Sequence, residues 1–237
     1  MSWNLKGGVI IIGSLLWQDY LDKPGDNIRA NWRAAHLDLN NKIYVRVPIR
    51  YGRTSQSNIM TMVFSNRMVR KMGFGFVVPF KRVINNKDEL LCEAIALSVA
   101  EGMKGNFVCP SWGVLAYLLN KSIDKNRKKE IVTLFRQRKN KEFDINKYKI
   151  KNEYSCISES LELNIDWVAP ISRNDKQQID AFHILLATAT MPDENIPTHK
   201  EIARTIKGDL VRKYFINNLI NGIITYDDFE IANLLLK

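Results

Sequence analysis

The stretch GGVIIIGSLLWQD, residues 7–19, decides the fold, because it reads as a buried strand that stops abruptly. Its run of aliphatic residues is typical of a strand in a protein core. The run ends at Gly13-Ser14, and Leu-Leu-Trp follows at once, so we expect a turn between the two apolar parts. Since glycine lets a ligand approach the backbone closely, this turn is a candidate for a site where backbone amides face a ligand.

Composition indicates a globular protein with a substantial core. The chain has 237 residues, of which 46% are hydrophobic, enough for one large domain or for a domain with a subdomain. No apolar run approaches the roughly 18 residues of a membrane span, and we interpret the N-terminus as the first strand, not a signal peptide. An odd number of cysteines without metal-ligand spacing predicts a reducing, cytoplasmic setting. These cysteines are Cys92, Cys109 and Cys156.

The positive charge is concentrated in one basic segment, residues 121–151. This segment holds twelve Lys or Arg and four Asp or Glu, so it supplies +8 of the net charge of +10. Two interpretations stay open. The segment is either a solvated helix and linker, or a surface that meets nucleic acid, an anionic ligand or an acidic partner. Aromatic residues are few here, which argues against a stacking platform for single-stranded nucleic acid.

Strand patterns dominate the first 80 residues, and helical patterns accumulate later. We expect strands at 42–49, 59–65, 73–80 and 161–171, helices at 24–39, 85–102 and 128–139, and a strand or a helix at 112–120. Gly73 and Gly75 indicate a bulge or a close backbone approach. The last fifty residues read as helical, with a helix ending near 190 and capping boxes at Thr198/Glu201 and Thr225/Asp228.

These patterns predict an α+β fold, a curled mixed sheet or small barrel wrapped by helices, with a helical C-terminal part. We divide the chain into three segments. Residues 1–120 would form the mixed-sheet core with the active-site loop and acid, and 121–151 a basic insertion. Residues 152–237 would add the late strand and the C-terminal helices to the same domain.

The sequence IIGSLLW, residues 11–17, resembles the loop after the first strand in the γ-glutamylcyclotransferase-like superfamily, most closely the ChaC type with its GYGSL loop. Ile12 stands where that family has the loop tyrosine. A Glu-Gly context after a helix also matches, in VAEGMKG, and makes Glu101 the corresponding acid. The resemblance implies a carbon-nitrogen lyase that cyclises a γ-glutamyl amide or amine by acid-base catalysis, without a metal or cofactor.

The residues themselves suit such chemistry. Cyclisation needs a deprotonated α-amine and a protonated leaving group, and one carboxylate whose pKa is raised by an apolar setting can serve both. Glu101, beside the flexible Gly102, is the candidate. The amides of Gly13, Ser14 and Leu15 would bind the substrate and a developing oxyanion.

A rival acid, Glu93, falls in the middle of the helix expected at 85–102. It does not share the face of that helix on which the apolar residues recur, so we expect it to be solvated.

A second distinctive stretch is VPIRYGRTSQS, residues 47–57. Arg50, Tyr51 and Arg53 would suit an anionic ligand, because guanidinium groups match carboxylate and phosphate. Strand alternation alone would not bring the two arginines to one face, so we expect a loop here. The competing interpretation is ordinary charge on an edge strand.

Other chemistries find little support. His36, His183 and His199 are far apart and follow no metal-binding pattern, and a surface role suits His199. Neither nucleotide-binding glycine motif occurs. Two alternatives to the enzyme remain. One is a non-catalytic binding module for an anionic small molecule or nucleotide on the same scaffold, and the other is nucleic-acid contact through 121–151. The oligomeric state cannot be read from these patterns.

Overall fold

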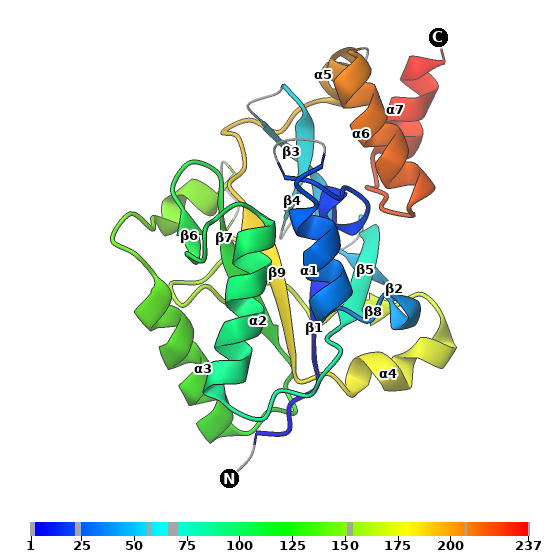
Figure 1. Ribbon diagram of the computed structural model, residues 1–237. Coiled ribbons are helices and arrows are strands. Elements are labelled where there is room, and N and C mark those ends of the chain that lie inside the picture. The colour runs from blue at the N-terminus through cyan, green and yellow to red at the C-terminus, as the bar shows by residue number, and fades with distance from the viewer. Residues whose placement is uncertain are drawn as a thin grey trace.

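The structure, a computed structural model, describes residues 3–21, 25–55, 58–65, 71–150, 154–206 and 208–236. The described chain has an α+β fold, with a mixed seven-stranded sheet and a separate two-stranded hairpin (Figure 1). The strands are β1 (Gly7–Ile11), β2 (Ile43–Val47), β3 (Ile49–Thr54), β4 (Met60–Phe64), β5 (Gly73–Pro79), β6 (Val108–Cys109), β7 (Gly113–Leu119), β8 (Ala169–Pro170) and β9 (Ile184–Thr190). The helices are α1 (Ile28–His36), α2 (Lys87–Ala100), α3 (Lys125–Arg138), α4 (Lys176–Asp180), α5 (His199–Ile206), α6 (Asp209–Ile220) and α7 (Asp228–Leu235). Short 3-10 helices are η1 (Ser14–Leu16), η2 (Leu39–Asn41), η4 (Ile145–Tyr148) and η5 (Arg173–Asp175).

The large sheet is open, with strand order β6-β7-β9-β1-β5-β2-β8. Only β1 and β9 pair in parallel among these neighbours. In the described residues β6 and β8 are the two edges and do not pair, so the expected curled sheet or barrel is wrong. The edge strand β8 contains Pro170, which has no N–H to pair with a further strand. After β2, Pro48 also lacks an N–H, and the chain leaves the large sheet there to form the hairpin β3–β4.

Strand β9 lies at the centre of the sheet, between β7 and β1. The expected helix end near residue 190 is therefore wrong, because Ile184–Thr190 is a strand. Both faces of this strand are covered, so its sequence lacks the alternation that marks a half-exposed strand. The predicted strand at 161–171 is also largely wrong, since it supplies only the two residues of β8 and isolated bridges.

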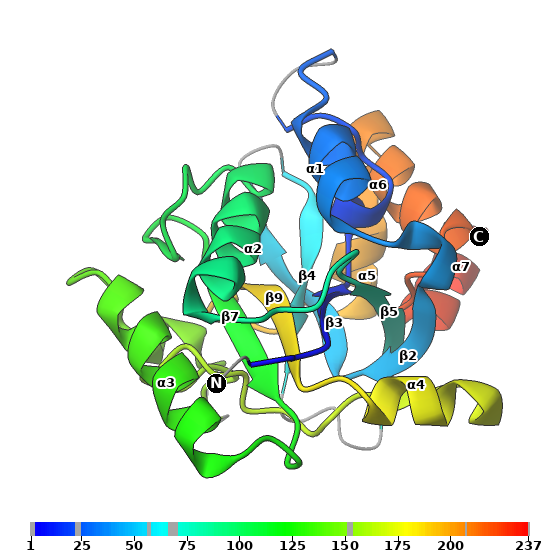
Figure 2. The same ribbon diagram turned by 60° about the horizontal axis from the view of Figure 1, so that its bottom comes forward.

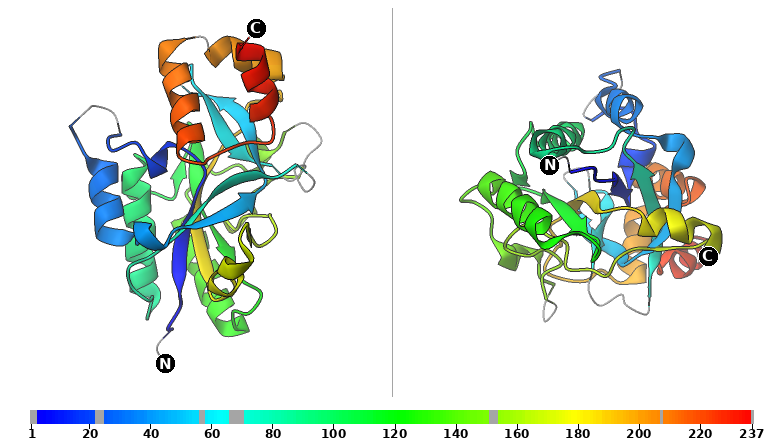
Figure 3. Two further views of the ribbon diagram at one scale, coloured as in Figure 1. Left: turned by 90° about the vertical axis from the view of Figure 1, so that its right-hand side faces the viewer. Right: turned by 90° about the horizontal axis from the view of Figure 1, so that it is seen from below.

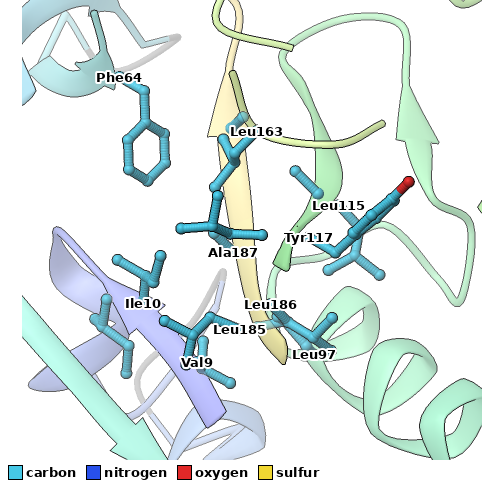
Figure 4. Close-up of a cluster of buried hydrophobic side chains, with 14 of the residues drawn as sticks. Val9, Ile10, Phe64, Leu97, Leu115, Tyr117, Leu163, Leu185, Leu186 and Ala187 are labelled. Atoms are coloured by element: carbon cyan, nitrogen blue, oxygen red, sulfur yellow. The ribbon is translucent and has the colours of Figure 1, made fainter. Parts of the chain in front are cut away.

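The core forms where the central strands meet the helices. Figure 4 shows side chains of β1, β7 and β9 packed with Leu97 of α2 and Phe64 of β4. Helix α2 packs against α1, α3 and β7, so these helices cover one face of the sheet (Figure 2). Within the described residues no helix combines the length and the apolar character that crossing a bilayer requires.

The helices expected at 85–102 and 128–139 are confirmed as α2 and α3, and residues 113–119 resolve as strand β7. The close approach expected at β5 is confirmed as well. A Cβ on Gly75 would lie 2.8 Å from the Ile11 carbonyl oxygen, and one on Gly73 would lie 2.6 Å from that of Ile224.

Helices α5, α6 and α7 gather at the end of the molecule where the hairpin β3–β4 lies (Figure 3). Both expected capping boxes are confirmed there. Glu201 accepts hydrogen bonds from the amide and hydroxyl of Thr198, at 2.7 and 2.8 Å. Asp228 does the same for Thr225, at 2.8 Å for each bond. This helical end places α6 beside the turn that follows β1.

Candidate functional site

The end of β1 opens into a pocket of about 200 Å³, here called the inner pocket. Its walls come from β1 and η1, the hairpin β3–β4, α1, α6, β9 and the ends of α2 and β7. The lining residues are Ile10, Ile11, Ile12, Gly13, Ser14, Leu15, Arg29, Arg53, Thr61, Met62, Glu101, Trp112, Thr188, Thr190 and Tyr214. The structure therefore brings the Gly13–Leu15 turn and Glu101 into one cavity, as the sequence predicts.

Glu101 is placed by the end of helix α2. Asn86 caps the start of this helix by accepting a hydrogen bond from the Glu89 amide. At the other end Gly102 has a φ of 79°, the left-handed conformation that stops a helix. Glu101 is thus the last residue before the chain reverses, and its side chain is only 12% exposed.

The Glu101 carboxylate is held by two protein donors. Arg29 Nη2 donates to Oε2 and Thr188 Oγ1 donates to Oε1, each at 2.8 Å. The expected apolar setting is therefore wrong, because a guanidinium and a hydroxyl contact this carboxylate. Each oxygen keeps a further lone pair that can accept a proton from a ligand.

Two buried arginines, one helical turn apart on α1, hold the turn and the acid in place. Arg29 Nη1 donates to the Ser14 hydroxyl at 3.0 Å, so one guanidinium bridges Ser14 and Glu101. Arg33 Nη1 donates to the carbonyls of Leu15 and Gln18, at 2.8 and 2.9 Å.

Burial and a neighbouring carboxylate shift the pKa of Arg33 in opposite directions. Burial lowers its pKa, and the carboxylate of Asp19, which accepts a hydrogen bond from Nη2, acts in the opposite direction. The ion pair with Asp19 therefore offsets part of the cost of burying the Arg33 charge, and Arg33 clamps the turn from outside the inner pocket.

The backbone N–H groups of Gly13, Ser14 and Leu15 are donors without partners. Within the described residues none of the three makes a hydrogen bond, as expected at the start of a short 3-10 helix. All three residues line the inner pocket, where a ligand carboxylate or oxyanion can accept from them.

Helix α6 supplies a tyrosine on the far side of the turn. A Cβ on Gly13 would lie 3.1 Å from the Tyr214 hydroxyl. Burial raises the pKa of Tyr214 to about 12, so its hydroxyl stays protonated at neutral pH and can donate. The Trp17 indole donates to Asn218 Oδ1 at 2.8 Å, which fixes α6 against η1.

The predicted arginine stretch is a strand, not the expected loop. Arg50, Tyr51 and Arg53 all lie on β3, whose register shifts between Tyr51 and Arg53, at Gly52. Arg53 lines the inner pocket, whereas Arg50 and Tyr51 are buried and do not. The extra residue of a bulge changes which face the following side chain occupies, and this could not be foreseen from alternation.

Glu93 is buried, with its side chain 1% exposed, so the expected solvated position is wrong. His36 Nδ1 lies 2.7 Å from one carboxylate oxygen, and Arg82 Nε donates to the other at 3.0 Å. These partners tie α1 and the segment before α2 to the helix, and Glu93 lies outside the lining of the inner pocket.

The remaining predicted features are spread over the molecule. The basic segment forms α3, a turn and η4 in its described part. His183 accepts from the Lys6 amide, and His199 pairs with Asp227 at the surface-facing ends of α5 and α7. Among the described residues no group of three His, Cys, Asp or Glu could hold a metal ion.

Four residues that contact Glu101 or the turn were missed from the sequence: Arg29, Arg33, Thr188 and Tyr214. The two arginines carried a weak signal, since they stand four residues apart and share one face of an amphipathic helix with Trp32. Thr188 and Tyr214 carried none, because their nearness to Glu101 and Gly13 depends on the packing of β9 and α6.

Comparison of this chain with protein-family models, with curated proteins and with solved structures finds no match. The geometry of the inner pocket is therefore the basis on which a function can be proposed.

Proposed function

We propose that this protein is an enzyme of the γ-glutamylcyclotransferase-like superfamily that cyclises a γ-glutamyl amide to 5-oxoproline and a free amine. One observation carries the proposal. The Glu101 carboxylate and the unpartnered amides of Gly13, Ser14 and Leu15 line the same small pocket. An acid-base group and an anion cradle in one cavity are the parts that this reaction needs.

In the proposed reaction the amides of the turn hold the α-carboxylate of the substrate. Glu101 removes a proton from the α-amine, whose nitrogen then attacks the γ-carbonyl carbon and forms the new C–N bond. Glu101 returns a proton to the leaving nitrogen as its C–N bond to the γ-carbon breaks. The proton count balances, since the proton taken from the ring nitrogen ends on the released amine.

Neighbouring side chains would orient these groups. Arg29 and Thr188 each fix one oxygen of Glu101, so the remaining lone pairs point in defined directions. The Tyr214 hydroxyl, close to Gly13, would donate to the substrate carboxylate or to the developing oxyanion. This hydroxyl would take the place of the loop tyrosine that Ile12 replaces.

Product analysis tests the proposal. The protein is incubated with a panel of γ-glutamyl amides, and 5-oxoproline and free amine are quantified together. We expect equimolar products from wild type and a rate about 100- to 10,000-fold lower for Glu101→Gln. The exposed Glu142→Gln serves as the matched control and should keep the wild-type rate. A folded wild type that releases no 5-oxoproline would overturn the proposal.

A second candidate is a non-catalytic binding module for an anionic small molecule. The observation that favours it is the double pairing of Glu101, because a carboxylate with two protein donors can serve structure alone. In that case calorimetry would detect binding of a γ-glutamyl amide without turnover, and Glu101→Gln would change affinity but release no product.

A further inference from the structure

A second cavity, here called the outer pocket, adjoins the inner one. It has a volume of about 530 Å³. Its lining residues are Arg53, Thr54, Ser111, Asp144, Asn146, Lys147, Lys149, Met191, Pro192, Asp193 and Glu194. Arg53 belongs to the lining of both pockets.

Three segments of chain pass from one pocket into the other. Trp112 and Thr190 line the inner pocket, and their sequence neighbours Ser111 and Met191 line the outer one. On β3, Arg53 lines both and the next residue lines only the outer pocket. The two cavities therefore share a continuous wall at β3, the start of β7 and the end of β9.

The size of the inner pocket limits what it can hold. Small-molecule sites are typically roughly 300–1,000 Å³, whereas the inner pocket has about 200 Å³. It suits a γ-glutamyl group and little more. The amine half of a γ-glutamyl amide would then lie beyond Arg53, in the outer pocket.

The uncommitted side chains of the outer pocket are mainly cationic. The Lys147 ammonium group makes no hydrogen bond or ion pair with any described residue, and the Lys149 ammonium group donates only to the neutral Asn146 side chain, at 2.8 Å. Arg53 donates one bond to the Ser111 carbonyl at 3.2 Å, which leaves most of its five N–H groups for a ligand. Burial lowers the pKa of Arg53, so an added anion would stabilise its charged form.

Two of the three carboxylates of the outer pocket hold local structure, each through one oxygen. Asp193 accepts from the Thr54 amide and hydroxyl at 2.7 and 3.0 Å. Asp144 accepts from the Asn146 amide and side chain at 2.9 and 3.1 Å. Glu194 alone among the three has no such bond within the described residues.

We propose that the outer pocket binds an anionic group, such as a carboxylate, sulfonate or phosphate, carried by the amine half of the substrate. Lys147 contacts this group from η4, Lys149 from the residue that follows η4, and Arg53 from β3. The end of the basic segment thereby becomes part of a small-molecule site instead of a nucleic-acid surface. This inference rests on the proposed function, because it concerns the other half of the same substrate.

The test compares γ-glutamyl amides whose short amine halves carry different charges. The probes are γ-glutamyl-taurine, γ-glutamyl-propylamide and γ-glutamyl-putrescine, which are anionic, neutral and cationic there. We expect KM for the anionic probe to be at least about tenfold below that for the neutral one, at similar kcat, and the difference to shrink with added salt. The double variant Lys147→Ala/Lys149→Ala should remove most of the difference, because only the Arg53 contact with the anionic group remains.

The matched control is Lys125→Ala/Lys129→Ala, which removes two exposed lysines of the same basic segment from helix α3, outside both pockets. It should keep the preference. Equal KM values for all probes, a preference for the cationic probe, or an unchanged preference in the Lys147/Lys149 variant would overturn the inference and leave the proposed function standing. Absence of 5-oxoproline from every probe would overturn the proposed function instead, and the inference with it.

Discussion

Arg29 joins three parts of the site through one guanidinium. It donates to the Ser14 hydroxyl, to the Ala100 carbonyl and to Glu101, from a side chain that is 10% exposed. Such a planar fork fixes directions that a flexible ammonium cannot. The position of Glu101 within the pocket thus depends on a residue 72 positions away in sequence.

We predict that Arg29→Lys lowers kcat/KM by roughly 100-fold. Lysine keeps the positive charge, but its ammonium group cannot hold Ser14 and Glu101 in the directions that the planar guanidinium sets. The free energy of unfolding should fall by about 1–3 kcal/mol through the lost hydrogen bonds. Steady-state kinetics and urea denaturation measure the two effects. Arg138→Lys, at an exposed position of α3, should change neither beyond about 0.5 kcal/mol. Wild-type kinetics in the Arg29 variant would show that the fork does not orient Glu101.

Among single residues, the sequence predicted that Glu101 and the Gly13–Leu15 turn lie together, but not the side chains that contact them. The helix ends at Gly102 and the first strand ends before Gly13, and in each case the glycine itself marks the end in the sequence. The contacts of Glu101 with Arg29 and Thr188 are set by packing, and the burial of Glu93 likewise follows from His36 and Arg82, which no local pattern reveals.

At the scale of elements, η1 and α6 come into close contact at Gly13. The Tyr214 hydroxyl would lie 3.1 Å from a Cβ at Gly13, closer than side chains normally approach. We predict that Gly13→Ala raises KM by about tenfold, by displacing Tyr214 or the substrate. Adding Tyr214→Phe, which removes the crowded oxygen, should then raise KM by less than it does in wild type. Strict additivity in this double-mutant cycle would contradict the contact.

The start of helix α7 gives a pH-dependent prediction. Burial raises the pKa of Asp228 from 3.8 to about 6. The folded state therefore favours the neutral carboxyl, and the stability this contributes below pH 4 is lost as the pH rises through 6. Relative to Asp228→Asn, wild type should lose up to about 3 kcal/mol of unfolding free energy between pH 4 and pH 7. Urea denaturation across this range measures it.

A control for that slope is Asp88→Asn, at an exposed position in the first turn of α2. It should follow the wild-type curve. If wild type and Asp228→Asn keep a constant difference across the range, the pKa of Asp228 is the same in the folded and unfolded states, which would contradict the prediction.

At the scale of the whole molecule, the central strand of the large sheet comes late in the sequence. Strand β9 lies between β1 and β7 and pairs with both. We predict that a chain ending at residue 183 does not fold, because the two halves of the sheet lose the strand that joins them. Circular dichroism and amide proton spectra should show no cooperative transition. Cooperative unfolding of this fragment would contradict the topology.

The α+β class of the fold was predictable from the sequence, but the open form of the sheet was not. Alternating and β-branched stretches predicted β2, β4 and β5, and apolar residues at helical spacing predicted α2 and α3. Strand β9 is buried on both faces and follows a helical turn, so its pattern resembles a helix of the C-terminal part. Pro48 was visible, yet only the structure shows that the chain leaves the sheet there.

The most direct measurement is a crystal structure of Glu101→Gln soaked with a γ-glutamyl amide that the variant cannot turn over. The account predicts density in the inner pocket, with the α-amino nitrogen within about 3.2 Å of the side chain at position 101. The α-carboxylate should accept from the amides of residues 13–15. Ligand bound elsewhere, or bound with its α-amine remote from position 101, would contradict the proposed role of Glu101.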